Sequence, residues 1–169
     1  GGVFLWGDSH AEALSFGIRS NLPAGVPFYQ VTSSACGATL GQNKSPVAFQ
    51  ATCNASNALA LKEIARIQPE MVVMAQQNSH ELTDWNEIAR HLKTLGVKEV
   101  VLVGPVPQWQ PSLPLVITKR HWNSADSQIV DQGLDQRLLK TDALLKEKLD
   151  PSVIDYISVI GGVCKGLAC

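Results

Sequence analysis

Val3-Phe4-Leu5-Trp6 runs directly into Gly7-Asp8-Ser9-His10, and the character of the chain changes at that junction. Four consecutive apolar residues are typical of a strand that is buried on both faces. After Ser9 the apolar residues recur at helical spacing, as Ala11, Leu14, Ile18 and Leu22. Ser9 is therefore expected between the carboxyl end of a strand and the amino end of a helix, where open α/β sheets bind ligands.

Two roles are open for the polar residues of this turn. The backbone N–H groups of a helix start, including that of Ser9, stabilise a developing oxyanion, and a serine on a strand-turn-helix is the form of a nucleophile elbow. Alternatively, Asp8 or Ser9 serves only as the cap of the helix.

Strands and helices continue to alternate along the chain. Further strands are expected at residues 26–32, 71–75, 98–104 and 153–159. Helices are expected from a cap at Asn54 or Ser56 to Ile67, from Asp84 to Leu95, and from Ala125 to Leu149, the last with a break at Gly133 as an alternative. Residues 42–52 and 108–124 carry no clear period and are expected to be loops. This order predicts an α/β protein: a three-layer α/β/α sandwich around a parallel sheet of about five strands.

Composition narrows the class of protein. A chain of 169 residues is long enough for one domain and too short for two of ordinary size. With 45% hydrophobic and 17% charged residues the balance is that of a globular protein. A net charge of −1 does not indicate a surface that binds nucleic acid. No apolar run approaches the roughly 20 residues that a membrane-spanning helix needs.

The motifs resemble those of a known family. Gly7-Asp8-Ser9-His10 after a hydrophobic strand resembles the first sequence block of SGNH (GDSL-like) hydrolases, and the histidine after the serine resembles the branch fused to acyltransferase-3 membrane proteins. Gly37 and Asn78, each after a predicted strand, match the second and third blocks, and Gly104-Pro105-Val106-Pro107 resembles the fourth region.

This resemblance implies a flavodoxin-like SGNH fold with Ser9 as the nucleophile. It also implies an oxyanion hole formed by the backbone N–H groups of Ser9 and Gly37 and by the side-chain amide of Asn78. Asn78 departs from the family pattern, because Gln77 and Ser79 replace the usual glycine and aspartate around it. Gly41 is the alternative to Gly37 and Gln77 the alternative to Asn78, and both positions also suit ordinary turn residues.

The four cysteines form two local pairs, Cys36 with Cys53 and Cys164 with Cys169. No histidine lies at metal-ligand spacing from either pair, so no metal site and no cofactor are expected. Two local disulfides in an oxidising compartment are the simplest reading, and buried free thiols are the alternative. The resemblance to the acyltransferase-linked branch favours the disulfides and a periplasmic or extracellular location.

The sequence holds no candidate for a complete catalytic triad. SGNH enzymes take their acid and base from a late Asp-x-x-His block, and no such block occurs in these residues, so we expect a single domain over residues 1–169 that lacks this segment. His10 suits orientation or a hydrogen bond at the helix end, and His91 suits a solvated helix face. His121, with Asp126 five residues on, is the one surrogate base. His80, Trp109, His121 and Trp122 are candidate substrate contacts, although the tryptophans equally suit a core.

Taken with the resemblance, these features imply the extracytoplasmic SGNH domain of a membrane O-acyltransferase. A membrane acyltransferase-3 domain, expected in the same polypeptide, would deliver an acetyl group to Ser9, and a hydroxyl of a cell-envelope polysaccharide would accept it. A free-standing SGNH carbohydrate esterase is the first alternative. A carbohydrate-binding or scaffolding module without catalytic activity is the alternative from another class.

Overall fold

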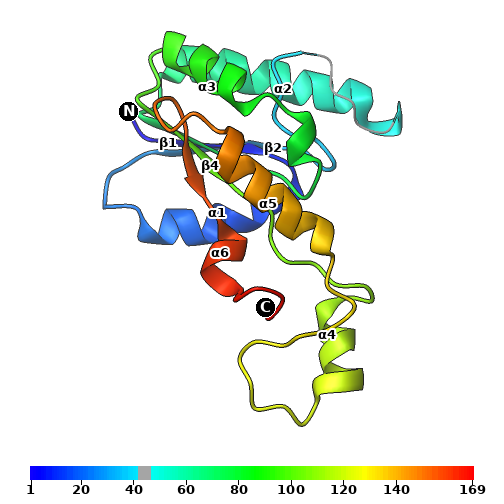
Figure 1. Cartoon of the computed structure of the whole chain (residues 1–169). Helices are drawn as coiled ribbons and strands as arrows, with labels where there is room; N and C mark the ends of the chain where they lie inside the picture. The colour runs from blue at the N-terminus through cyan, green and yellow to red at the C-terminus, as the bar shows by residue number, and fades with distance from the viewer. Residues whose placement is uncertain (42–46) are drawn as a thin grey trace.

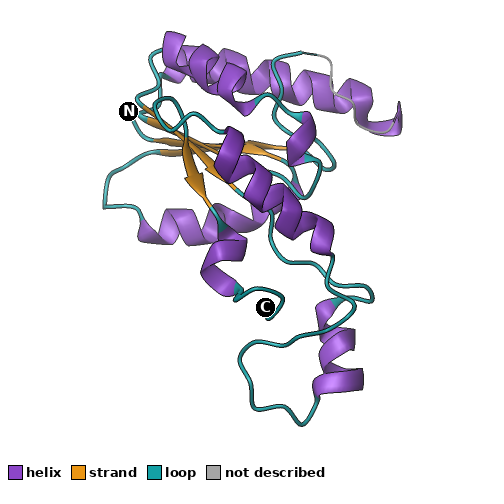
Figure 2. Cartoon of the chain, in the orientation of Figure 1, coloured by secondary structure: helices purple, strands orange, loops and turns teal. Residues whose placement is uncertain are grey.

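Five parallel strands form one sheet in the order β2-β1-β3-β4-β5 in the computed structural model, which describes residues 1–41 and 47–169 (Figure 2). The strands are β1 (Val3–Gly7), β2 (Phe28–Thr32), β3 (Met71–Ala75), β4 (Glu99–Val103) and β5 (Asp155–Ile157). The expected parallel sheet is confirmed. The chain passes from β1 to one side and then returns past it to β3, so the strand order reverses at β1, and such switch points are where ligands bind.

Helices cover both faces of the sheet. Phe4 and Trp6 of β1 face a core with α2 (Val47–Ile67), α3 (Trp85–Thr94) and α5 (Gln136–Lys148). Val3 and Leu5 face the opposite side, where Ala11 of α1 (Ser9–Asn21) packs. Figure 1 shows α2 and α3 above the sheet and α1 below it. Because adjacent residues of β1 point to opposite faces and both faces are covered, its continuous apolar run is explained and the three-layer sandwich is confirmed.

The beginning of α2 differs from the expectation. The helix starts at Val47, so the predicted cap at Asn54 or Ser56 is wrong, and the predicted loop at 42–52 is wrong from Val47 onward; residues 42–46 lie outside the described residues. The helix continues through the polar stretch that was expected to be a loop and a cap, because Cys53 and Asn57 of this stretch turn their side chains inward. Cys53 is buried, and one turn later Asn57 accepts a hydrogen bond from the Trp6 indole at 2.8 Å.

The predicted helix from Ala125 to Leu149 is also shorter than expected. The helix α5 begins at Gln136, where the Asp135 carboxylate caps it by accepting from the Arg137 N–H at 3.0 Å. The residues before it form bends, a turn and isolated β-bridges, and Ile129 exchanges backbone hydrogen bonds of 2.8 and 3.0 Å with Cys169. Pairing with a segment forty residues later in the chain therefore overrides the helical spacing of the apolar residues.

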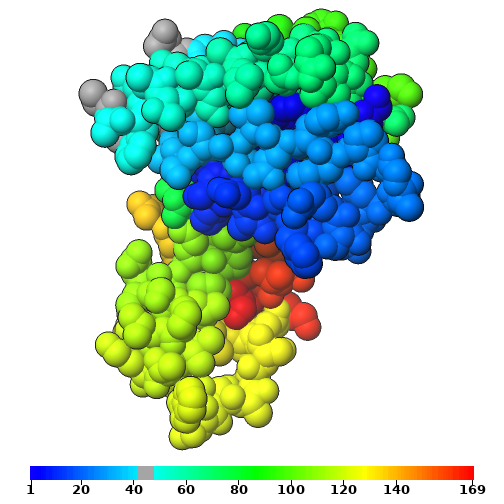
Figure 3. Space-filling model, turned by 180° about the vertical axis from the view of Figure 1, so that it is seen from behind, coloured from blue at the N-terminus to red at the C-terminus, as the bar shows by residue number. Residues whose placement is uncertain are grey.

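The segment expected to be the long loop 108–124 contains two short helices, α4 (Leu113–Val116) and the π-helical η2 (Ile117–His121). With the residues that follow, they form a lobe beside the sandwich (Figures 1 and 3). Trp109, Val116 and Leu134 make a small buried core that joins this lobe to the rest of the domain. The C-terminal helix α6 (Val159–Val163) follows β5 and leads to the end of the chain.

Both predicted disulfides are present. Cys36–Cys53 connects the turn after β2 to α2, and Cys164–Cys169 closes the C-terminal loop. Both sulfurs of the first pair belong to buried residues, so this bond holds the loop that carries Gly37 against the helix layer.

Candidate active site

The ends of three adjacent strands lie at one level of the sheet. Gly7, the last residue of β1, is in register with Thr32 of β2 and Ala75 of β3. Beyond this level the Ser33 N–H still donates to the Gly7 carbonyl at 3.1 Å, and the Asp8 N–H to the Ala75 carbonyl at 3.4 Å. The segments that carry Ser9, Gly37 and Asn78 therefore leave the sheet side by side.

Gly7 is required at this level by close packing. A Cβ atom on it would lie 1.9 Å from the Ala75 carbonyl oxygen and 3.0 Å from the Cβ atom of Ala11. No side chain fits in that space. The glycine thus permits α1 to start directly beside the end of β3, which brings Ser9 close to the residues that follow β3.

Ser9 is the first residue of α1 and is exposed, whereas Asp8 before it is buried. The two carboxylate oxygens of Asp8 have different partners: Oδ1 accepts from the His10 N–H at 2.8 Å, and Oδ2 accepts from the Gln77 N–H at 2.7 Å. The sequence suggested the first contact, since Asp is a common helix cap. The second contact joins residues 69 positions apart and has no signal in the sequence. Asp8 therefore fixes the strand-to-helix turn to the loop after β3.

Gly37 is fixed from the side of α2. Its carbonyl accepts from the Asn57 side chain at 3.2 Å, and the same Asn57 side chain accepts from the Trp6 indole. The loop thus has a rigid support built from β1, α2 and the adjacent disulfide.

Asn78 lies on the surface three residues after the end of β3. Its carbonyl oxygen accepts from the Gln76 Nε2 at 2.8 Å, and its Oδ1 accepts from the Ser79 hydroxyl at 3.2 Å. Among the described residues nothing accepts a hydrogen bond from its Nδ2. This donor is therefore available for a ligand, as is required of an oxyanion-hole amide.

A groove of about 710 Å³ lies at this edge of the sheet. Its walls include Asp8, Gly37 and Asn78, so the structure brings two of the predicted oxyanion-hole residues into one groove, next to the residue that precedes Ser9. The alternatives Gly41 and Gln77 also line it. The walls of the groove combine amide, hydroxyl and carboxylate side chains with apolar ones such as Leu40, Leu82 and Ile88. Such a mixed lining is usual for sites that bind small molecules.

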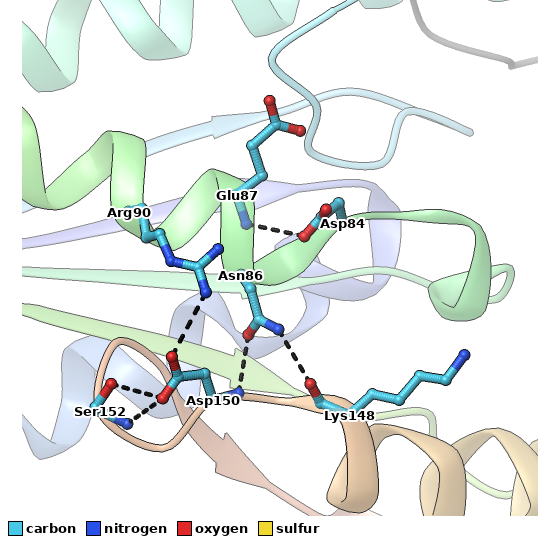
Figure 4. Close-up of polar contacts among 7 residues, drawn as sticks. All are labelled: Asp84, Asn86, Glu87, Arg90, Lys148, Asp150 and Ser152. Atoms are coloured by element: carbon cyan, nitrogen blue, oxygen red, sulfur yellow. Dashed lines mark hydrogen bonds and ion pairs between the residues drawn. The ribbon is translucent and has the colours of Figure 1, made fainter.

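The far wall of the groove is the start of α3, with Asp84 and Glu87. The Asp84 carboxylate caps this helix by accepting from the Glu87 N–H at 2.9 Å. On its other side Asn86 holds the segment after α5: its Nδ2 donates to the Lys148 carbonyl at 3.0 Å and its Oδ1 accepts from the Asp150 N–H at 2.9 Å (Figure 4). The Glu87 side chain points away from these contacts, so α3 is held on one side and leaves its acidic side chain on the other.

One of the histidines differs clearly from the expectation. The side chain of His80 is completely buried, so the prediction that it contacts substrate is wrong. Burial is the main reason that its pKa falls to about 4, with the charge of His10 as the second cause. His91 is exposed on α3, as expected of a solvated histidine.

His121 does not pair with Asp126. Its Nε2 lies 2.9 Å from Asp131, while Asp126 accepts from the Ser124 hydroxyl at 3.1 Å. The Gly133 N–H and then the His121 ring hold the pKa of the Asp131 carboxyl below its usual range. The predicted surrogate base therefore has a different acidic partner, and it belongs to the lobe of α4 and η2.

Trp109 and His121 line a second, largely apolar cavity of about 350 Å³ at the base of this lobe. Trp109 is 9% exposed and packs in the small core, whereas Trp122 is 72% exposed. The expectation that these two side chains contact substrate stays a prediction. Among the described residues, no three His, Cys, Asp or Glu side chains gather as metal ligands, and no helix has the length and apolarity to cross a membrane.

A doubly wound α/β sheet with an exposed serine where β1 meets α1 defines a domain of the SGNH type. The family model described as SGNH domain (fused to AT3 domains) matches residues 1–169, so the chain belongs to this family, and the expected acyltransferase-3 branch is confirmed. Among solved structures, the chain is similar to the lipopolysaccharide acetyltransferase periplasmic domain of Salmonella ser. Paratyphi A, with a TM-score of 0.76 and 20% sequence identity over 99% of this chain and 69% of that chain. At this identity the likeness concerns the fold. No curated protein matches the sequence significantly.

Proposed function

We propose that this chain is the extracytoplasmic, periplasmic domain of a membrane O-acyltransferase and that it transfers an acetyl group through Ser9 to a hydroxyl of a cell-envelope polysaccharide. The observation that carries the proposal is the exposed Ser9 at the β1–α1 junction, directly after Asp8, which lines one groove together with Gly37 and Asn78. Membership of a family fused to AT3 domains supports the acyl donor, and the description of the structural neighbour supports the envelope polysaccharide as acceptor.

The reaction has two steps. In the first, the Ser9 oxygen attacks the acyl carbonyl carbon, the bond to the donor's leaving group breaks, and an acetyl-serine ester forms. In the second, an acceptor hydroxyl attacks this ester and releases Ser9. Each step passes through a tetrahedral oxyanion, for which we propose three donors: the backbone N–H groups of Ser9 and Gly37 and the Nδ2 of Asn78.

Two features of this chain favour stabilisation of the oxyanion. The partial positive charge of the α1 N-terminus lies at Ser9, and Asp8 holds the turn against the loop of Asn78 through the Gln77 N–H. A serine hydroxyl also needs a base to remove its proton. We propose that a late Asp-x-x-His segment, which residues 1–169 do not contain, supplies it.

The test is acetylation of Ser9 in the full-length protein. After exposure to an activated acetyl ester, peptide mass spectrometry of the wild type is expected to show an acetyl adduct on Ser9. The Ser9→Ala variant is expected to show none and to lose transfer to polysaccharide. Ser20→Ala, which removes an exposed serine from the last turn of the same helix, is the matched control and should retain both. An adduct confined to other residues would overturn the proposal.

The same experiment separates the transferase from the esterase. If the acetyl-serine ester is consumed faster by water than by any added polysaccharide, the domain is a carbohydrate esterase. A binding module would form no adduct at all, and Ser9→Ala would leave its affinity for polysaccharide unchanged.

A further inference from the structure

We propose that the side-chain amide of Gln76 holds together the two loops that carry Gly37 and Asn78 and thereby positions both oxyanion donors. The inference rests on the proposed function of Ser9 and names a positioning residue for the same site. Gln76 is the first residue after β3 and is only 7% exposed, whereas the three residues after it are exposed. A buried amide among exposed neighbours needs a structural reason, because burial removes its hydrogen bonds to water.

One end of the amide fixes the Asn78 loop. The Nε2 of Gln76 donates to the Asn78 carbonyl at 2.8 Å and so closes a tight turn within the chain. Ser79, directly after that carbonyl, has a left-handed backbone with φ of 60°. Since the Asn78 carbonyl and side chain share one Cα atom, fixing the peptide after Asn78 limits the directions in which its Nδ2 can point.

The other end of the amide lies against Gly37. A Cβ atom at position 37 would be 2.3 Å from the Gln76 Oε1 and 3.1 Å from its Cδ. The backbone of Gly37 therefore packs directly on the amide, and a side chain at this position would displace it. Gly37 has no left-handed φ, so the glycine is explained by this close approach rather than by its backbone conformation.

The two contacts together make Gln76 the link between the loops after β2 and β3. Asn57 supports Gly37 from the side of α2, and Asp8 supports the Gln77 N–H from the side of β1. The Gln76 side chain contacts both loops, at Gly37 and at the Asn78 carbonyl. Its Oε1 is buried and has no hydrogen-bond partner among the described residues.

The first experiment is a double-mutant cycle on thermal stability. Gly37→Ala in the wild type is expected to lower the melting temperature by several degrees, because the added methyl group collides with the amide. In a Gln76→Ala background the same substitution should have little effect, because the amide has been removed. Equal effects of Gly37→Ala in both backgrounds would overturn the contact on which the inference depends.

The second experiment measures acetylation of Ser9 in the full-length protein, at a temperature where circular dichroism shows each variant folded. Gln76→Ala is expected to lower kcat about 10- to 100-fold while KM for the acetyl ester stays within about threefold, since the donors are displaced but the groove remains. Gln68→Ala is the matched control: the Gln68 amide also donates to a backbone carbonyl, that of Leu95, away from the site. It should leave kcat unchanged.

The experiment distinguishes failure of the positioning role of Gln76 from failure of the proposed function of Ser9. If the wild type acetylates Ser9 and Gln76→Ala does so at the same rate, the positioning role is overturned and the proposed function stands. If the wild type forms no adduct on Ser9, both are overturned, and a positive stability cycle would then describe packing alone.

Discussion

Replacing His80 should change how the stability of this domain depends on pH. The ring is completely buried beside Trp85, and neither of its nitrogens has a hydrogen-bond partner among the described residues. Burial disfavours the charged ring and, together with the charge of His10, lowers its pKa from 6.5 to about 4, while a contact with the Val103 backbone opposes the shift. The folded protein therefore keeps this histidine neutral at pH values where the unfolded chain would protonate it.

The sign and size of the effect follow from these two pKa values. Between pH 6.5 and 4 the unfolded chain binds more protons at this site than the folded protein, so the free energy of unfolding falls as the pH falls. One pKa unit corresponds to about 1.4 kcal/mol, which gives a loss of about 3 kcal/mol over this interval. Above pH 6.5 both states are neutral, and below pH 4 both are charged, so this group contributes no further change there.

The measurement is urea unfolding of wild type and His80→Leu at several pH values from 7.5 to 4, with the disulfides intact. Relative to the wild type, His80→Leu should gain about 3 kcal/mol between the two ends of this range, because it has no proton to bind. At pH 7.5 the substitution should cost less than about 1.5 kcal/mol, since no buried hydrogen bond is lost. His91→Gln, at an exposed position of α3, is the control and should follow the wild type. Parallel curves for wild type and His80→Leu would refute the reasoning.

Two further substitutions test the framework of the domain. Asp142 is buried and accepts hydrogen bonds from the Tyr156 hydroxyl at 2.6 Å and the Ser158 hydroxyl at 2.7 Å. Asp142→Asn should therefore lower the free energy of unfolding, measured in urea at pH 7, by about 2 kcal/mol. An unchanged value would contradict the role of this carboxylate in joining α5 to β5. Replacing Cys36 and Cys53 together by serine should cost about 3 kcal/mol, because the bond closes a loop of 17 residues, and the loss should vanish when both proteins are compared under reducing conditions.

The sequence was sufficient for the elements whose patterns are local. The buried run of β1, the cap at Asp84 and the stop at Gly96 each lie within a few residues, and the structure follows them. The predicted start of α5 was wrong because the true start depends on a contact that is distant in the sequence. The apolar residues before Gln136 have helical spacing, but Ile129 pairs with Cys169 instead. The start of α2 was wrong for a similar reason, since Asn57 and Cys53 are held by partners on β1 and after β2.

In the candidate site, too, the local features were predicted and the contacts between distant residues were not. Parallel strands in register were enough to predict that the residues after β1, β2 and β3 meet at one edge, and Gly37 and Asn78 do line one groove. The side chains that hold them there were not predicted. The bond from Gln77 to Asp8 and the packing of Gln76 on Gly37 each join residues far apart in the sequence, and neither residue type signals such a contact. His80 was misplaced because a histidine among polar residues gives no sign that its side chain turns inward.

These contacts also explain why the site tolerates an unusual loop after β3. In a strand-end site the backbone of each loop must be fixed, because a donor that moves by about 1 Å loses much of its effect on the transition state. Here the fixing groups are two buried polar side chains, Asp8 and Gln76, and each contacts the loop after β3 by one hydrogen bond. Both hydrogen bonds go to backbone atoms, the Gln77 N–H and the Asn78 carbonyl, so this support does not depend on the side chains of these two exposed residues. The position of the proposed donors therefore depends on two largely buried side chains in the groove wall, and changes to those residues should affect turnover more than binding.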